Sequence, residues 1–139
     1  MRGERERGGL QLLDTRVGPF HLLVDPQHVL AVEPQREFGD DDVIVSCDLR
    51  RLLGVEPRRP EGDCLLVATD AALFRLGVCW VGQLVRCDTR HLFRVPAVLS
   101  PLAERVGLRA VFELGEELSY LLDLTRLADY ALSLRAGAA

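Results

Sequence analysis

Short apolar runs, each followed by a turn signal, divide this chain of 139 residues along most of its length. The runs at 10–16, 20–24 and 28–33 are each followed by Gly or Pro within a few residues. Many short strands at such close spacing are typical of small β-barrels and sandwiches. The sequence therefore predicts a mainly β fold, with further strands at 43–47, 64–69, 73–87 (bent or broken near Gly77 or Gly82), 91–95, 108–114 and 117–124.

Two of these runs end in the same way. "VIVSC" leads into Asp48 and "LSYLL" into Asp123, and each Asp begins the pattern Asp-Leu-x-Arg-Leu. An Asp at the start of a helix caps free backbone N–H groups, and its charge favours the positive helix end. We therefore expect a short helix after Asp48, closed by Gly54, and a C-terminal helix at about 124–135.

A third helix is predicted after Ser100-Pro101, because Ser is a favoured N-cap and Pro suits the first helical turn. Gly107 marks its end, and Gly115-Glu116 fits a two-residue hairpin turn. The polar stretch at 35–42 is predicted to be a loop. The stretch at 55–63, with two prolines and a glycine, is predicted to separate two halves of the chain.

The charge balance disfavours a nucleic-acid partner. Acidic residues outnumber basic ones 21 to 17, and the pI is near 5.4, whereas nucleic-acid binders usually carry a basic excess. No apolar run approaches the ~18 residues of a membrane span, and the charged start lacks the apolar segment of a secretory signal. We expect a cytoplasmic protein that does not insert into a membrane, with a disordered tail at 1–9.

No spacing of cysteines or histidines matches a known metal or catalytic pattern. Metal sites usually include a close pair of cysteines, but none is present among Cys47, Cys64, Cys79 and Cys87. The histidines are scattered at His21, His28 and His91. We expect reduced, buried thiols and no catalytic residue, metal or cofactor.

Five segments of the sequence, taken in order, resemble the bacterial chemotaxis coupling protein CheW. The run "VCWVGQLVRCD" (78–88) is similar to V-D-x-V-x-E-V-V-x-V, and "TRHLFRVP" (89–96) to the link that follows it. "VIVSCDLRRLLG" (43–54) resembles V-x-P-V-x-D-L-R-x-L-L-G. The last hairpin of the family is similar to 107–129, and a strand pair around V-x-E-[IV] to 20–34. The resemblance spans about residues 10 to 130, so the chain is identified as a divergent CheW-like domain with a shortened first barrel.

The resemblance implies two small SH3-like β-barrel subdomains with short capping helices and a C-terminal helix. In this interpretation residues 10–136 form a single CheW-like domain, with subdomain one at about 10–56 and subdomain two at about 63–124. It further implies a non-enzymatic adaptor that couples chemoreceptor signalling tips to the regulatory domain of a CheA-type histidine kinase. The alternative hypothesis is a small β-barrel sensor that binds a ligand or metal through Cys79, Cys87 and nearby histidines.

The chain departs from the family in the region that binds receptors. No N-L-R-G motif lies between Pro34 and Val43, and Ala31 stands where the family has Glu. A divergent form would then bind only one of the two partners. Relative to the family, the first barrel also lacks a strand, which predicts an open edge near 28–33 or 43–47 for a partner or for self-association, unless the tail or the C-terminal helix covers it.

Five residues are predicted to bind partners. The resemblance places four of them near the groove between the barrels: Val29, Val32, Val81 and Leu84. Trp80 is a candidate anchor, because Trp is enriched at interface hot spots. Each of the five fits an ordinary core position as well.

Overall fold

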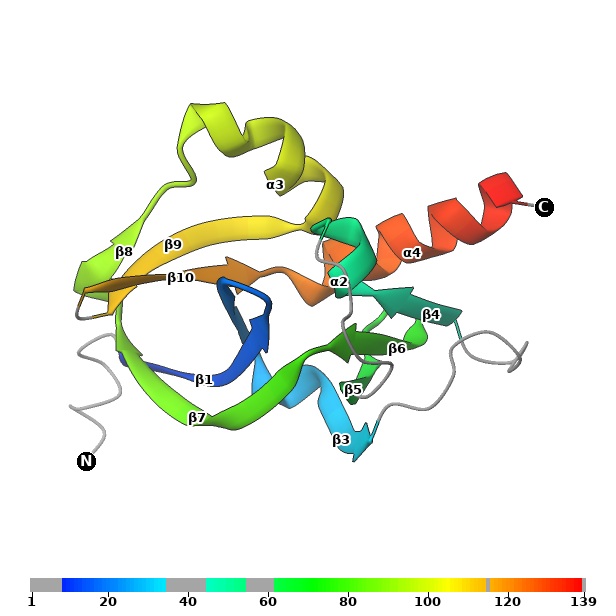
Figure 1. Ribbon diagram of the computed structural model, residues 1–139, viewed down its shortest axis with the longest axis horizontal. Helices are drawn as coiled ribbons and strands as arrows, with labels where there is room; N and C mark the ends of the chain where they lie inside the picture. Colours follow the sequence, from blue (N-terminus) through cyan, green and yellow to red (C-terminus); the bar gives the residue numbers. More distant parts are fainter. Residues whose placement is uncertain (1–8, 35–44, 55–61, 115, 139) are drawn as a thin grey trace.

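The computed structural model describes residues 9–34, 45–54, 62–114 and 116–138 (Figure 1). Its strands are β1 (Gly9–Val17), β2 (Phe20–Val24), β3 (Val29–Pro34), β4 (Val45–Asp48), β5 (Asp63–Ala68), β6 (Leu73–Val78), β7 (Trp80–Asp88), β8 (Leu92–Phe93), β9 (Leu108–Leu114) and β10 (Glu117–Leu122). Its α-helices are α2 (Leu49–Leu52), α3 (Ser100–Val106) and α4 (Leu124–Ala138). Three 3₁₀ turns are η1 (Pro26–His28), η2 (Thr89–His91) and η3 (Ala97–Leu99).

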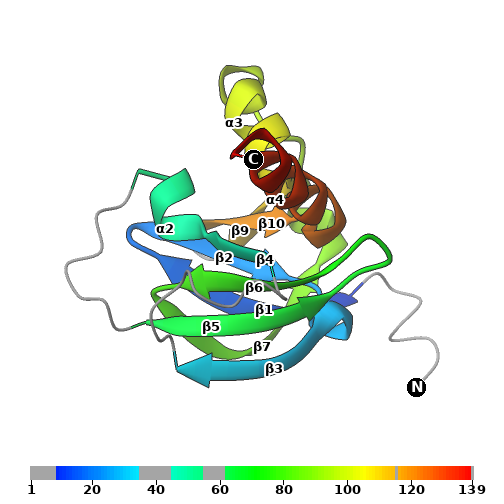
Figure 2. The same cartoon turned by 90° about the vertical axis from the view of Figure 1, so that its right-hand side faces the viewer.

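The strands form two sheets, which confirms the predicted mainly β class with two β parts. Sheet A has the order β7-β1-β2-β10-β9-β8, and sheet B has the order β3-β5-β6-β4. Sheet A curves strongly, and α3 and α4 lie on the same side of the molecule (Figure 2). The subdomain bounds expected at 10–56 and 63–124 do not correspond to the sheets, because each sheet takes strands from both ranges.

The two faces of sheet A contact two separate apolar clusters. The main core joins sheets A and B to α2, α3 and α4, and its largest fully buried side chains include Leu22, Leu49, Leu65, Phe74, Leu76 and Leu127. The second cluster lies on the opposite face of sheet A and contains Leu12, Leu23, Cys87 and Phe112. Sheet A is therefore packed on both faces, and its strands can bury apolar side chains of either parity.

The repeated Asp forms helix caps at both predicted positions. The Asp48 carboxylate accepts a hydrogen bond from the Arg50 backbone N–H (3.0 Å) at the start of α2. Asp123 accepts from the N–H groups of Thr125 (3.0 Å) and Arg126 (3.2 Å) at the start of α4. In both cases the preceding strand pairs in parallel, β4 with β6 and β10 with β2.

Two further Asp residues cap 3₁₀ turns that the sequence analysis did not predict. Asp25 accepts from the Gln27 N–H, and Asp88 from the Arg90 N–H, both at 2.9 Å. The turn η2 occupies 89–91, so β8 is shorter than the predicted strand at 91–95. The chain is thus redirected after both β2 and β7 by the same Asx-type turn.

Several predicted boundaries change in the structure. The run 73–87 breaks at Cys79, two residues after Gly77, because the chain passes there from sheet B to sheet A, and its second part carries a bulge next to Gly82. Ser100 begins α3 but makes no capping hydrogen bond, whereas Gly107 ends it in a left-handed conformation (φ 75°) as expected.

The prediction of open edges is tested only in part. β3 and β4 are the end strands of sheet B in the described part of the chain, and β4 contacts α4. The predicted loop at 35–42, the tail at 1–8 and most of the 55–63 stretch lie outside the described residues.

Thiol labelling should distinguish one cysteine from the other three. Burial raises the pKa of Cys47 to about 12 and that of Cys64 to about 11, and it also raises the pKa of Cys87. Cys79 is exposed. Because the thiolate is the reactive form, we expect one rapidly reacting thiol per native chain with Ellman's reagent and four in denaturant. Rapid loss of a second thiol in the native protein would contradict this packing.

The two Asp-x-Arg turns form a matched pair for a stability measurement. Arg50 donates from Nε (2.9 Å) and Nη2 (3.0 Å) to Asp48, and its side chain is only 4% exposed. Arg90 makes the same contacts to Asp88 at 83% exposure. Asp48→Ala should destabilise the fold by about 3 kcal/mol, because it removes both of these hydrogen bonds and the opposite charge from a buried cation. Asp88→Ala should cost much less. Urea unfolding measures the two losses of stability. Equal unfolding midpoints for Asp48→Ala and Asp88→Ala would show that the burial of Arg50 does not determine the size of the loss.

Candidate partner-binding surfaces

The five predicted site residues lie on two strands. Val29 and Val32 belong to β3 in sheet B, and Trp80, Val81 and Leu84 belong to β7 in sheet A. β3 and β7 are both end strands of their sheets in the described part of the chain. The predicted residues thus lie on strands at the ends of the two sheets, where side chains on a sheet face can remain partly exposed.

A bulge in β7 separates Trp80 from the other residues of this strand. β1 pairs Leu13 with Leu84, Thr15 with Val81 and Arg16 with Trp80. From the first pair to the second, β1 advances two residues (13 to 15) and β7 advances three (84 to 81), so β7 carries one extra residue. Because side chains alternate along β1 and cross-strand partners share a face, Leu84 and Val81 lie on one face and Trp80 on the other.

Four of the predicted residues border the main core, and we call them the main-core rim: Val29, Val32, Val81 and Leu84. Val29 and Val81 pack partly buried against the core. Val32 is 50% exposed although its cross-strand partner Leu65 is fully buried, and Leu84 is 48% exposed opposite Leu13. Val32 and Leu84 therefore keep apolar surface exposed, while Val29 and Val81 mainly pack against the core.

Trp80 lies on the face of sheet A that points away from the main core, and it is 45% exposed. The Arg16 guanidinium carbon lies 5.4 Å from the centre of the indole ring, in the range of a cation–π contact. The ring extends over Gly82, where a Cβ atom would lie 2.4 Å from the indole Cη2. Gly82 is thus required for this position of the indole.

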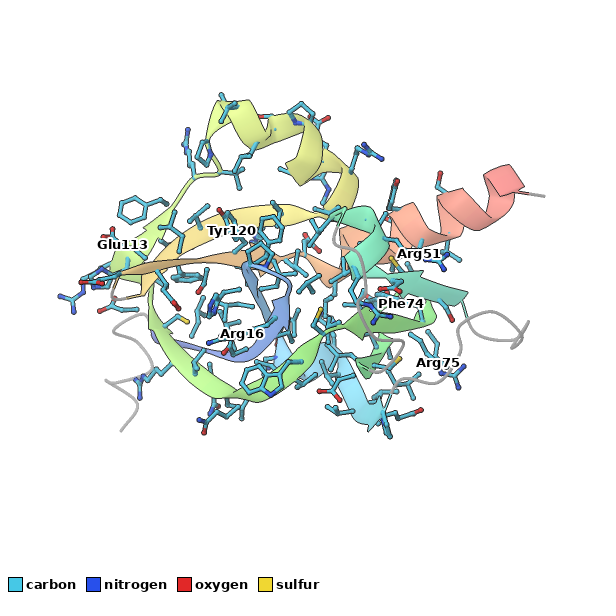
Figure 3. All side chains as sticks on the ribbon, viewed as in Figure 1. Arg16, Arg51, Phe74, Arg75, Glu113 and Tyr120 are labelled. Atoms are coloured by element: carbon cyan, nitrogen blue, oxygen red, sulfur yellow. The ribbon has the colours of Figure 1, made fainter. Side chains whose placement is uncertain are left out.

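Arg16 belongs to a row of side chains that crosses four strands of sheet A. Its neighbours on either side are Trp80 on β7 and His21 on β2, and His21 is next to Ser119 on β10. The His21 ring lies 3.1 Å from the Glu117 carboxylate through Nε2 and 3.9 Å from Asp14 through Nδ1. Figure 3 shows Arg16 within the curve of sheet A.

This row and several exposed apolar side chains were not predicted from the sequence. The row depends on the pairing of strands distant in sequence, and no sequence signal specifies that register. Four residues that were not selected are more exposed than Val32, with Val98 at 85%: Leu30, Phe93, Val98 and Leu118. Leu30, Phe93 and Leu118 occupy runs that were predicted to be strands, and Val98 lies between a predicted strand and a predicted helix, so nothing in the pattern marked them as surface.

The residues of the alternative sensor hypothesis do not form a site. Cys79 is exposed, whereas Cys87 is buried in the second cluster. His28 lies 3.2 Å from the Ala68 carbonyl oxygen, in a backbone contact. In the described ranges, no three His, Cys, Asp or Glu side chains gather in a way that could hold a metal ion. The same ranges contain no helix with the length and apolar character needed to cross a membrane.

Comparison with known proteins supports the fold but finds no sequence relative. No family model matches the chain, and no curated protein matches it significantly. The structure is similar to that of the scaffolding protein TtCheW from Thermoanaerobacter tengcongensis, with a TM-score of 0.63 and 11% sequence identity. The match covers 81% of this chain and 88% of TtCheW. The chain therefore has a CheW-like fold.

Proposed function

We propose that this protein is a non-enzymatic adaptor of a bacterial chemosensory signalling array, located in the cytoplasm. The observation that carries the proposal is the likeness of its fold to that of TtCheW, a scaffolding protein, over most of both chains. The placement of half-exposed apolar side chains on both faces of β7 also supports it. An adaptor needs at least two separate surfaces, and buried apolar area is the general source of affinity at such surfaces.

We propose the regulatory domain of a CheA-type histidine kinase as the first partner and a chemoreceptor signalling tip as the second. The receptor contact has less support, because the chain lacks N-L-R-G and has Ala31 in place of Glu. The main-core rim is the proposed contact surface, with Val32 and Leu84 supplying its exposed part. The end strands β3 and β4 offer backbone groups through which a second copy could pair.

Separate titrations of the purified chain test this proposal. The partners are the regulatory domain of a cognate histidine kinase and a receptor signalling tip, each followed by isothermal titration calorimetry. Binding to both indicates a coupling adaptor, and binding to the kinase domain alone indicates a divergent form that competes for one partner. If the chain binds neither partner, the adaptor function is refuted.

Substitutions in the main-core rim should weaken this binding. Leu84→Asp and Val32→Asp place a charge where apolar surface would be buried, so each should reduce affinity about tenfold or more, equivalent to about 1.4 kcal/mol. Gln83→Asp is the matched control, because Gln83 is exposed on the same strand. Unchanged affinity for both rim variants, with thermal melts like that of the parent chain, would exclude the rim as the contact surface.

A further inference from the structure

Trp80 and Arg16 form an exposed aromatic–cation pair outside the main-core rim. They are cross-strand partners on the face of sheet A opposite to Leu84 and Val81. Both side chains are exposed to solvent, and both residue types are enriched among interface hot spots. The pair therefore has the composition of a binding surface, and the bulge in β7 separates it from the surface already described.

The indole of Trp80 is held in place before any partner arrives. Arg16 contacts its ring at 5.4 Å, and the absence of a side chain at Gly82 lets the ring lie against the strand. A Trp side chain has only two rotatable bonds, and fixing them in the free protein reduces the entropy lost on binding. This geometry favours the role of a preformed anchor over that of a loose surface side chain.

The charge of Arg16 is not neutralised within the described part of the chain. Two acidic side chains nearby contact His21 and not Arg16: Glu117 on β10 at 3.1 Å, and Asp14, two residues before Arg16 on β1, at 3.9 Å. No carboxylate among the described residues forms an ion pair with Arg16, so its N–H donors remain available beside the ring. A guanidinium in this state favours a partner carboxylate, which it can bind in a bidentate manner.

We propose that Trp80 and Arg16 form a second docking surface for a protein segment that carries an acidic side chain next to an apolar one. The apolar side chain packs on the exposed indole, and the carboxylate binds Arg16 on its Trp80 side. Glu117, which lies beyond His21 on β10, repels a carboxylate on that side of Arg16 and so favours the Trp80 side. The inference deepens the proposed adaptor function by naming the chemistry of one partner.

Two variants with matched controls test this surface against the kinase domain and the receptor tip. Trp80→Ala and Arg16→Glu should each weaken binding to one of the two partners at least tenfold. This loss should occur with Leu84 unchanged, that is, with the main-core rim intact. Arg109→Glu is the control for charge, because Arg109 is exposed on β9, which is not a neighbour of β7 in sheet A. Gly82→Ala should give an intermediate loss, because it displaces the indole without removing it.

Intrinsic fluorescence reports the contact directly, since Trp80 is the only Trp of the chain. Binding at the proposed surface should shift its emission to shorter wavelength. The same readout applies to a synthetic pentapeptide of alternating glutamate and leucine. This peptide should give a saturable shift that Arg16→Glu abolishes, while the corresponding lysine–leucine peptide should give none. Trp80→Phe and Arg16→Gln, checked by circular dichroism melts, separate lost contacts from lost folding.

The outcomes distinguish this inference from the adaptor function. The docking surface would be overturned if Trp80→Ala and Arg16→Glu bind every partner of the parent chain with unchanged affinity and the peptide gives no fluorescence shift. That result would leave the adaptor function intact. A peptide-induced shift without binding of either partner would support the docking surface and refute the adaptor function.

Discussion

The organisation of the molecule depends on one run of chain, Leu73–Asp88, that belongs to both sheets. As β6 it lies inside sheet B, and after Cys79 it continues as β7 at the end of sheet A. Hydrogen bonds fix this crossing: the Cys79 N–H donates to the Arg16 carbonyl (2.9 Å), and the Val81 N–H donates to the Asp63 carboxylate (2.9 Å). Because the two sheets share this run, the main core can form between them as one unit.

The bulge in β7 determines which face of sheet A each residue after the crossing occupies. A regular strand would place Trp80 and Leu84 on one face, since they are separated by an even number of residues. The extra residue near Gly82 changes this parity, so that one strand presents an aliphatic residue beside the main core and an aromatic residue on the opposite face. A single short element can thereby serve two different surfaces.

Sequence reasoning succeeded where local chemistry decides the structure. The strands at 20–24 and 108–114 have the predicted bounds, and Asp48 and Asp123 cap helices because capping involves only the next few residues. It failed where distant pairing decides. A bend or break was predicted near Gly77 or Gly82, and the chain does break at Cys79 and bulge next to Gly82. The local pattern did not show that the chain changes from sheet B to sheet A between these two points. The assignment of strands to sheets likewise depends on contacts that no local pattern specifies.

The same division applies to the candidate site. The sequence identified apolar residues on β3 and β7, and three of the five are half exposed: Val32, Trp80 and Leu84. It could not assign them to faces, because the bulge appears only through the register with β1. Arg16 was not selected at all, since its contact with Trp80 joins two strands more than sixty positions apart in the chain.

The position of β10 also determines the order in which the molecule can be completed during synthesis. β10 lies in the middle of sheet A, between β2 and β9, and pairs in parallel with one of the first strands of the chain. The strands of sheet B all lie before residue 79, so they can pair while the last third of the chain is still being translated. The apolar edge of β2 stays unpaired until residue 122 has emerged from the ribosome. A nascent chain of this protein therefore exposes an aggregation-prone edge that the finished molecule does not have.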